Sequence, residues 1–336
     1  MPTLAEVAQH AGVTSATVSN VLRQRGKVGV KTRQRVLASV AALAYRPNLT
    51  ARALAEGRAP TLALMVASIA NPFYPEFALA AEQAARRHGR FLIVCNTNDD
   101  PDSGRAYLEQ IAGTLSDGVL VMNAKLHMDD LRLTEQRGAP VVLCMWEKPD
   151  EAPGLPCVAV DFYHAGALAA RHLVELGHRA IGAINGSDCL HGERYRGFTE
   201  TMAALGHPDA LLQTEYVADS IEGGRQAAAA LLAAQPQLTA IFASNDLPAL
   251  GAMHAAADLG RKVPHDLSVI GITDIRSARE TRPALTTVAV PTEEAATLAV
   301  ELLLELIAQP DQSPPLRVTT APRLVVRAST APPRAG

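Results

Sequence analysis

The sequence predicts an α/β protein that begins with a small all-α domain. From Thr61 onward, short β-rich runs alternate with amphipathic helical stretches, whereas the first 58 residues show helical periodicity alone. Alternating strands and helices are typical of parallel sheets covered by helices. The chain has 336 residues, 48% of them hydrophobic, which suits about two domains with a sizeable core.

Three short helices are expected in the N-terminal segment. Thr3 and Glu6 form a capping-box pattern that starts the first helix, Gly12 ends it, and Thr14 caps the second. The third helix is expected over residues 31–44, ahead of Pro47. The inward-facing positions are Leu4, Val7, Ala8 and Ala11, then Val18, Val21 and Leu22, then Val36, Leu37, Val40 and Leu43.

Charge divides the chain at about residue 58. The first 58 residues hold nine Lys and Arg against Glu6 and Glu56, a net charge of +7, and the remainder holds 22 basic and 32 acidic residues, a net charge of −10. A small basic segment on an acidic body indicates a polyanionic partner for the segment alone. A merely solvated basic surface is the alternative.

The second expected helix presents a small polar face opposite its apolar positions. Its members are Ser15, Ala16, Thr17, Ser19 and Asn20. Such a face fits a DNA major groove, where Asn20 pairs with adenine and the Ala16 methyl contacts thymine. An ordinary solvated helix face is the alternative interpretation.

Two α/β halves follow. The expected strands cover residues 62–66, 91–94, 119–122 and 141–144, then 181–184, 240–243 and 267–270, and the second set alternates with helices near 164–176, 192–205, 222–234 and 247–259. Polar and aromatic residues follow several strand ends, which indicates a ligand cleft between the halves. Asp246 has the alternative role of a helix N-cap, and Phe73 that of a core residue.

Several classes of protein are disfavoured. Cys95, Cys144, Cys157 and Cys189 are widely spaced, so neither a metal site nor a disulfide framework is expected. There is no secretion signal and no apolar run long enough for a membrane span, so a cytoplasmic protein without membrane association is expected. Phosphate-loop, dinucleotide, zinc-protease and serine-hydrolase motifs are absent, so no catalytic residue and no cofactor is expected. A stand-alone solute-binding protein and a small α/β enzyme with an appended head are the remaining alternatives.

The first segment resembles the head and hinge of the lac repressor (LacI/GalR) family. The likeness runs from Thr3 to Leu22, through Thr32-Arg33 and Tyr45-Arg-Pro-Asn48, to Ala51-Arg52-Ala53-Leu54. It implies base contacts from Ser15, Ala16 and Asn20, phosphate contacts from Thr3, Thr14, Thr17, Ser19, Thr32 and Arg33, and hinge contacts from Asn48, Ala51 and Leu54. Leu54 matches the minor-groove wedge of the family. Gly29 departs from the family's usual serine cap.

The body resembles the regulatory domain of the same family. The motifs are Asn71-Pro-Phe-Tyr74, Asp117-Gly118, Leu176-Gly-His-Arg179, Arg194-Tyr-Arg-Gly-Phe198, Ala243-Ser-Asn-Asp246, Val263-Pro264, Ser268-Val-Ile-Gly271 and Pro283-Ala-Leu-Thr286. This domain is similar to periplasmic sugar-binding proteins and has two lobes joined by three crossovers. The resemblance implies that Phe73, Tyr74, Trp146, Arg194 and Asn245 face a small-molecule effector.

Three positions depart from the family pattern. Thr273 stands where many sugar- or purine-binding members have a ligand-gripping aspartate, Asp219 stands where a stacking aromatic residue is common, and Met145 replaces the usual aspartate before Trp146. Asp219 and Thr273 are included in the expected effector site. Either the carboxylate has moved to Asp219, or an acidic ligand binds Arg194 directly.

The resemblance implies a ligand-responsive repressor of a catabolic operon, with a sugar or sugar acid as effector. It would bind a pseudo-palindromic stretch of double-stranded operator DNA as a homodimer. The expected parts are a head at 1–46, a hinge helix at 47–58, an effector and dimerisation domain at 59–330, and a tail at 331–336. Lobe 1 takes about 59–160 with 291–316, and lobe 2 takes 161–290 with 317–330. Residues 308–336 show no leucine heptad, so no further oligomerisation coil is expected.

Overall fold

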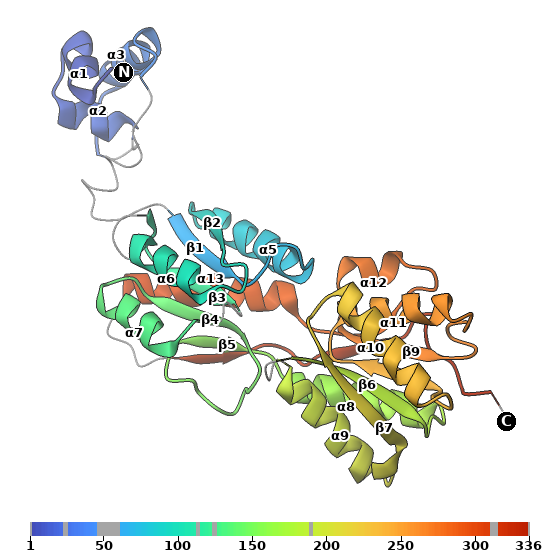
Figure 1. The fold of residues 1–336 in the computed structure, drawn as a ribbon. Coiled ribbons are helices and arrows are strands. Elements are labelled where there is room, and N and C mark those ends of the chain that lie inside the picture. The colour runs from blue at the N-terminus through green and yellow to red at the C-terminus, as the bar shows by residue number, and fades with distance from the viewer. Residues whose placement is uncertain are drawn as a thin grey trace. The chain divides into compact units, whose positions relative to one another are not determined.

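The computed structural model describes residues 2–22, 26–45, 61–111, 115–122, 126–187, 191–309 and 315–334. The chain forms two compact units, Met1–Ala59 and Pro60–Gly336. Figure 1 shows a helical first unit and a second unit with two sheets.

In its described part, the first unit contains α1 (Leu4–Ala11), α2 (Ser15–Leu22) and α3 (Val30–Ala42). The capping box is confirmed, since the Glu6 amide donates to Thr3 Oγ1 at 3.2 Å and the Thr3 amide donates to Glu6 Oε2 at 2.7 Å. Gly12 ends α1 with a φ of +61°, and the Thr17 amide donates to Thr14 Oγ1 at 3.2 Å. Local capping therefore sets both ends of the turn between α1 and α2.

The core of the first unit differs from the expectation at one position. The buried residues from the three helices include Val7, Ala8, Ala11, Val18, Val21 and Val36. Leu37, expected to face inward, is 48% exposed, and Ser39 is buried instead. The helical period places residue 37 about 100° away from Val36, whereas residues 39 and 40 return to the inner face. The Ser39 hydroxyl stays satisfied because it donates to the Arg35 carbonyl at 2.9 Å.

The second unit has two lobes, each with a six-stranded sheet in its described residues. The sheet of lobe 1 has the order β11-β5-β4-β3-β1-β2, and all its pairings are parallel. Its strands are β1 (Thr61–Val66), β2 (Phe91–Asn96), β3 (Val119–Met122), β4 (Val141–Trp146), β5 (Cys157–Ala159) and β11 (Leu316–Val318). Helices α5 (Phe73–Arg87) and α13 (Thr292–Ala308) pack together on one face, with α6 (Pro101–Gln110) and α7 (Met128–Gln136) on the other (Figure 1).

Lobe 2 repeats this arrangement with the sheet order β12-β10-β9-β8-β6-β7, parallel except for the β10–β12 pair. Its strands are β6 (Ile181–Gly186), β7 (Leu211–Val217), β8 (Ala240–Ala243), β9 (Ser268–Thr273), β10 (Thr286–Ala289) and β12 (Arg323–Val325). The covering helices are α8 (Phe162–Glu175) paired with α9 (Gly192–Ala204), and α10 (Ile221–Ala234) paired with α11 (Asp246–Asp258). A one-turn 3₁₀ helix, η2 (Pro208–Ala210), precedes β7, and the short α12 (Arg276–Glu280) follows β9.

Within the described residues the chain passes between the lobes three times, from β5 to α8, from β10 to α13, and from β11 to β12. The predicted helical head and two-lobed parallel α/β body are therefore confirmed. The sequence pattern missed β5, β7, β10, β11 and β12. Three of these strands lie at sheet edges, and four have only three or four residues. Their hydrophobic pattern is therefore too short or too polar to be recognised as a strand in the sequence.

The central strands are buried on both faces, as parallel sheets require. In β1, Leu62, Leu64 and Val66 join one apolar cluster, while Ala63 and Met65 join the cluster beneath α6 and α7. This rigid packing fixes the strand ends, from which the polar residues of both lobes project.

Candidate functional site

Polar residues gather at the carboxyl ends of the lobe 2 strands. Asn185 lies near the end of β6, Asp219 follows β7, and Asn245 and Asp246 follow β8. The register pairs Asn185 with Tyr216 of β7 and Ile184 with Ala243 of β8, so these ends lie side by side. This edge of a parallel sheet is where ligands bind in open α/β folds.

Arg194 on α9 is fully enclosed, with 1% of its surface exposed. Its Nη1 donates to the Ser244 carbonyl at 2.9 Å, and its guanidinium carbon lies 4.0 Å from the ring centroid of Phe162 on α8. α8 and α9 approach so closely that a Cβ on Gly166 would lie 1.9 Å from the Arg194 carbonyl. A hydrogen bond, a cation–π contact and close helix packing therefore hold this side chain.

Glu147 of lobe 1 forms an ion pair with Arg194 of lobe 2. Glu147 directly follows β4, and its Oε1 lies 3.2 Å from Arg194 Nε. Burial raises the pKa of Glu147 and lowers the pKa of Arg194, and the charge of each residue opposes the shift of the other. The sequence analysis missed Glu147, although the rule of polar residues at strand ends applies to it as well.

Asp219 is the second link between the lobes. Its Oδ2 accepts from Nδ2 of Asn71 in lobe 1 at 2.9 Å and from Nδ2 of Asn245 in lobe 2 at 2.8 Å. Burial raises the pKa of Asp219 to about 6, and the charge of Arg194 opposes that shift. The carboxylate that the sequence places at this unusual position thus lies at the contact between the lobes.

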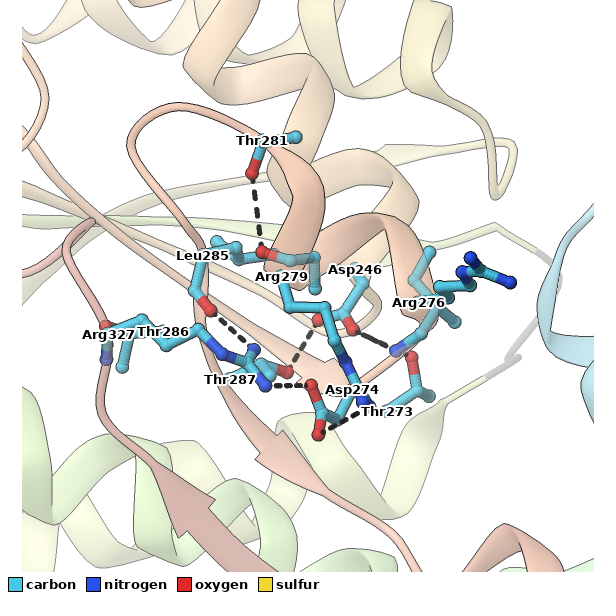
Figure 2. A network of polar contacts seen from close by, with 12 residues as sticks. Asp246, Thr273, Asp274, Arg276, Arg279, Thr281, Leu285, Thr286, Thr287 and Arg327 are labelled. Atoms are coloured by element: carbon cyan, nitrogen blue, oxygen red, sulfur yellow. Dashed lines mark hydrogen bonds and ion pairs between the residues drawn. The ribbon is translucent and has the colours of Figure 1, made fainter.

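Asp246 belongs to a buried network behind the cleft (Figure 2). It is not the N-cap of α11, because Asn245 takes that place and its Oδ1 accepts from the Asp246 amide at 2.7 Å. The Asp246 carboxylate instead accepts from Thr287 Oγ1 at 2.6 Å, the Ile275 amide at 2.9 Å and Thr273 Oγ1 at 3.2 Å. Burial raises the pKa of Asp246 to about 6. This carboxylate ties α11 to β9 and β10.

Thr273 and Asp274 have positive φ angles of 124° and 59°. The hydroxyl of Thr273 points to Asp246, while Asp274 pairs with Arg279 and Arg327, as Figure 2 shows. The carboxylate that follows Thr273 therefore holds α12 and the C-terminal segment.

The expected aromatic residues have different surroundings. Phe73 and Tyr74 start α5 with their ring centroids 6.0 Å apart, and Phe73 is buried in the apolar core. Trp146 packs against the apolar cluster beneath α6 and α7, and its indole nitrogen donates to the Glu151 carbonyl at 2.8 Å. The structure connects Arg194, Asp219, Asn245 and Thr273 through shared neighbours, whereas the contacts of Trp146 lead to the α6 and α7 side of the sheet.

Three buried polar atoms of the cleft lack a hydrogen-bond partner among the described residues. They are Asn185 Oδ1, Asp219 Oδ1 and Arg194 Nε. Arg194 Nε forms an ion pair with Glu147, but the geometry of this pair is not that of a hydrogen bond. Unsatisfied buried polar groups are rare in native proteins and mark sites that a ligand or water completes. Across the same part of the chain there is no group of three His, Cys, Asp or Glu that would hold a metal ion.

The head presents its own polar surface on α2. Ser15, Ala16 and Asn20 are exposed opposite the buried Val18 and Val21. Among the other expected DNA contacts, Thr3 and Thr14 are exposed, and Thr17, Ser19, Thr32 and Arg33 are half-buried. The expected hinge, with Asn48, Ala51 and Leu54, lies outside the described residues.

Comparison with known proteins connects both surfaces to one family. Residues 3–48 match the model of bacterial regulatory proteins of the lacI family, and residues 170–330 match that of a periplasmic binding protein-like domain. The chain is 34% identical to the HTH-type transcriptional repressor PurR of Yersinia enterocolitica (serotype O:8 / biotype 1B), over 98% of this chain and 97% of that protein. The chain belongs to the lacI family of bacterial regulatory proteins.

Solved structures show the same architecture for this lacI-family regulator. The lac repressor dimer bound to operator and the anti-inducer ONPF has a TM-score of 0.86 at 24% identity, over 98% of this chain and 99% of that one. The complex of the transcriptional regulator CelR with cellobiose has a TM-score of 0.70 at 29% identity, over 98% and 100% of the two chains. A lacI-family protein is a DNA-binding regulator of transcription, so the expectation that the chain is not an enzyme is confirmed. None of the helices described here has the length and apolar character to cross a membrane.

Proposed function

We propose that this lacI-family protein represses a catabolic operon by binding a pseudo-palindromic operator as a homodimer, and that a sugar or sugar acid in the interlobe cleft changes its affinity for DNA. The observation that carries the DNA-binding part is the exposed face of α2, where small polar side chains stand opposite a buried apolar stripe. The relative from Yersinia enterocolitica is named a transcriptional repressor, which supports repression here. A regulator of this kind acts on the chromosome, so we expect it in the cytoplasm.

On the head, we assign base contacts to Ser15, Ala16 and Asn20. Their short side chains allow the helix to approach base edges closely, and Asn20 has the paired donor and acceptor that adenine requires. Phosphate contacts are assigned to a surrounding set: Thr3, Thr14, Thr17, Ser19, Thr32 and Arg33. Residues 47–58 are assigned to a hinge helix that places Asn48, Ala51 and Leu54 at the minor groove.

Homodimerisation is supported by an apolar surface on lobe 1. Strand β2 lies at the edge of its sheet and exposes Phe91, Ile93 and Val94, while Leu79 is exposed on the neighbouring α5. An uncovered apolar edge strand is a liability for a monomer and suits a second copy of the chain. Two heads related by twofold symmetry then match two half-sites.

We assign the effector site to the contact region between the lobes. The residues that we expect to face the effector are Phe73, Tyr74, Trp146, Arg194, Asp219, Asn245 and Thr273. Asn71 and Glu147 reach Asp219 and Arg194 from the opposite lobe, so the relative position of the lobes depends on these side chains. A ligand that replaces or reinforces these contacts shifts the balance between lobe arrangements. The solved structure of the transcriptional regulator CelR is a complex with cellobiose, which supports a sugar-sized occupant here.

Selection of operator DNA tests the proposal. The full chain is incubated with random duplexes, and the retained sequences are amplified and sequenced through several rounds. We expect an inverted repeat whose half-sites change at one position when Asn20→Ala is used, with a loss of about 1–3 kcal/mol in discrimination at that base pair. Recovery of random sequence, or of a motif unchanged by Asn20→Ala, would contradict the assignment.

A further inference from the structure

The charges around the cleft already balance Arg194 without a ligand. Glu147 Oε1 lies 3.2 Å from Arg194 Nε, and Arg194 Nη1 is committed to the Ser244 carbonyl at 2.9 Å. Asp219 and Asp246 add two further carboxyl groups within electrostatic range of the same guanidinium. An anionic ligand would therefore meet three acidic groups around one cation that is already paired.

The buried polar atoms without a partner indicate which hydrogen-bonding groups a ligand has to supply. Two of the three unpartnered atoms, Asp219 Oδ1 and Asn185 Oδ1, are buried hydrogen-bond acceptors with no donor among the described residues. The third, the donor Arg194 Nε, lies 3.2 Å from Glu147 Oε1, so its charge is already paired. The donors that do reach Asp219, from Asn71 and Asn245, both use the other oxygen, Oδ2. A buried acceptor without a donor is energetically unfavourable, so a ligand that supplies hydrogen-bond donors to both atoms gains affinity from each.

We propose that the effector is a sugar-sized, hydroxyl-bearing molecule without negative charge, whose hydroxyl or ammonium groups donate hydrogen bonds to Asp219 and Asn185. This inference rests on the proposed effector site and narrows it, because it excludes the sugar acids. The charge of Arg194 is then neutralised by Glu147, and its Nη1 binds the Ser244 carbonyl, so a ligand carboxylate would have to displace Glu147. Asp219 supplies the ligand-binding carboxylate that is missing at Thr273.

The test uses sets of three compounds that share a carbon skeleton and differ in charge. Each set contains a neutral sugar, its amino sugar and its uronic acid, for example glucose, glucosamine and glucuronate, with the corresponding galactose set and the aldopentoses and disaccharides. The melting temperature of the full chain is recorded with each compound at equal concentration, and dissociation constants of the compounds that raise it are measured by calorimetry. We expect the neutral or amino member of a set to raise the melting temperature and the acid to have the smallest effect.

Affinity measurements on three variants show which residues make binding depend on the charge of the ligand. Asp219→Asn should weaken a neutral sugar about tenfold and an ammonium-bearing ligand more strongly, which distinguishes the two donor types. Glu147→Gln should release Arg194 and improve the affinity for the acid about tenfold relative to wild type. Glu293→Gln is the matched control, because Glu293 lies on α13 at an open groove of about 980 Å³ between the lobes, whose lining includes Thr273 and none of Arg194, Asp219, Asn185 or Glu147.

Several results would overturn the inference. One is an acid that binds wild type more tightly than its neutral and amino counterparts. Another is a complete lack of response to neutral and amino compounds by protein that selects its operator. A ligand that is weakened by Glu293→Gln and not by Asp219→Asn would place binding in the groove and would also contradict it. If no operator is selected, the proposed function itself fails, so the two failures are distinguishable.

Discussion

The two lobes share one architecture and contribute differently to the cleft. Lobe 2 supplies the buried polar side chains, including Arg194, Asp219 and Asn245, and holds each of them with contacts from its own elements. Lobe 1 supplies Glu147 and Asn71, which reach Arg194 and Asp219 from the opposite side. Identical folds thus serve as a preorganised binding surface in lobe 2 and as a closing surface in lobe 1.

Arg194→Ala is expected to have the largest effect of the variants considered. It removes the ion pair, the hydrogen bond to Ser244 and the contact with Phe162, and it leaves Glu147 facing a buried gap. Breaking one side of a buried pair costs about 3–5 kcal/mol, so denaturant unfolding should show a loss in this range. Arg196→Ala on the same helix is the control, since Arg196 is 56% exposed and its surface pairs contribute at most about 1 kcal/mol. Equal losses in the two variants would show that Arg194 has no special role.

Gly166→Ala tests how tightly lobe 2 fixes Arg194. A Cβ there would meet the Arg194 carbonyl at 1.9 Å and the Phe198 amide at 2.8 Å, so the α8–α9 pair must separate at a cost of about 3 kcal/mol. In lobe 1, Gly104→Ala meets only the end of the Leu126 side chain and a Thr97 methyl within 4 Å, and Leu126 can rotate, so this variant should lose much less. Gly192→Ala, with open space around it, should be neutral or slightly stabilising. The three melting temperatures should follow this order; a Gly104→Ala variant as unstable as Gly166→Ala would refute the difference between the lobes.

Asp219 and Asp246 should respond oppositely to the same substitution. Asp246 accepts three hydrogen bonds, so Asp246→Asn turns an amide toward a donor and should destabilise the protein by about 1–3 kcal/mol. Asp219 has one unpartnered oxygen, so Asp219→Asn removes a buried charge without losing its two donors. The variant should therefore be more stable than wild type at neutral pH.

The sign of the pH dependence follows from the raised pKa of Asp219. The folded-state pKa is about 6 and the ordinary value is 3.8, so folded protein retains the proton across this window and loses stability as pH rises through it. The groups that set this pKa are Arg194, Asn71, Asp246 and Asp99. The stability difference between Asp219→Asn and wild type should grow from near zero below pH 4 to about 1–3 kcal/mol at pH 7. A difference that is independent of pH, with Asp209→Asn as the exposed control, would rule out a buried charge at Asp219.

Among the substitutions at the contact between the lobes, Asn71→Ala should have the smallest effect. Asp219 keeps its hydrogen bond from Asn245, so the lobes lose one contact worth about 1 kcal/mol. Effector affinity should fall about fivefold, less than for Arg194→Ala or Asp219→Asn. Calorimetric titration of the same ligand into Asn71→Ala and Asp219→Asn compares the two lobes. A greater loss of ligand affinity in Asn71→Ala than in Asp219→Asn would reverse the roles assigned to the lobes.

The sequence predicts the fold and part of the site because the relevant signals are local. The Thr3–Glu6 capping box, the Gly12 stop and the alternation of strands and helices are properties of short segments, and the structure contains all of them. The rule that ligands bind at strand ends identified the segments that contain Arg194 and Asn245. It did not identify Glu147 as the partner of Arg194, because that pair joins segments of different lobes. Leu37 was misplaced because apolar composition alone does not fix the angle at which a helix meets its neighbours.

The most direct test of the account is the operator affinity of wild type and Arg194→Ala, each measured with and without a ligand that raises the wild-type melting temperature. Fluorescence anisotropy with the selected operator gives the ratio of the two affinities for each protein. The account predicts that the ligand changes wild-type affinity at least about fivefold and that the ratio stays near one in Arg194→Ala. An unchanged wild-type affinity, or the same change in both proteins, would contradict a cleft in which lobe 2 binds the effector and controls the DNA-binding state.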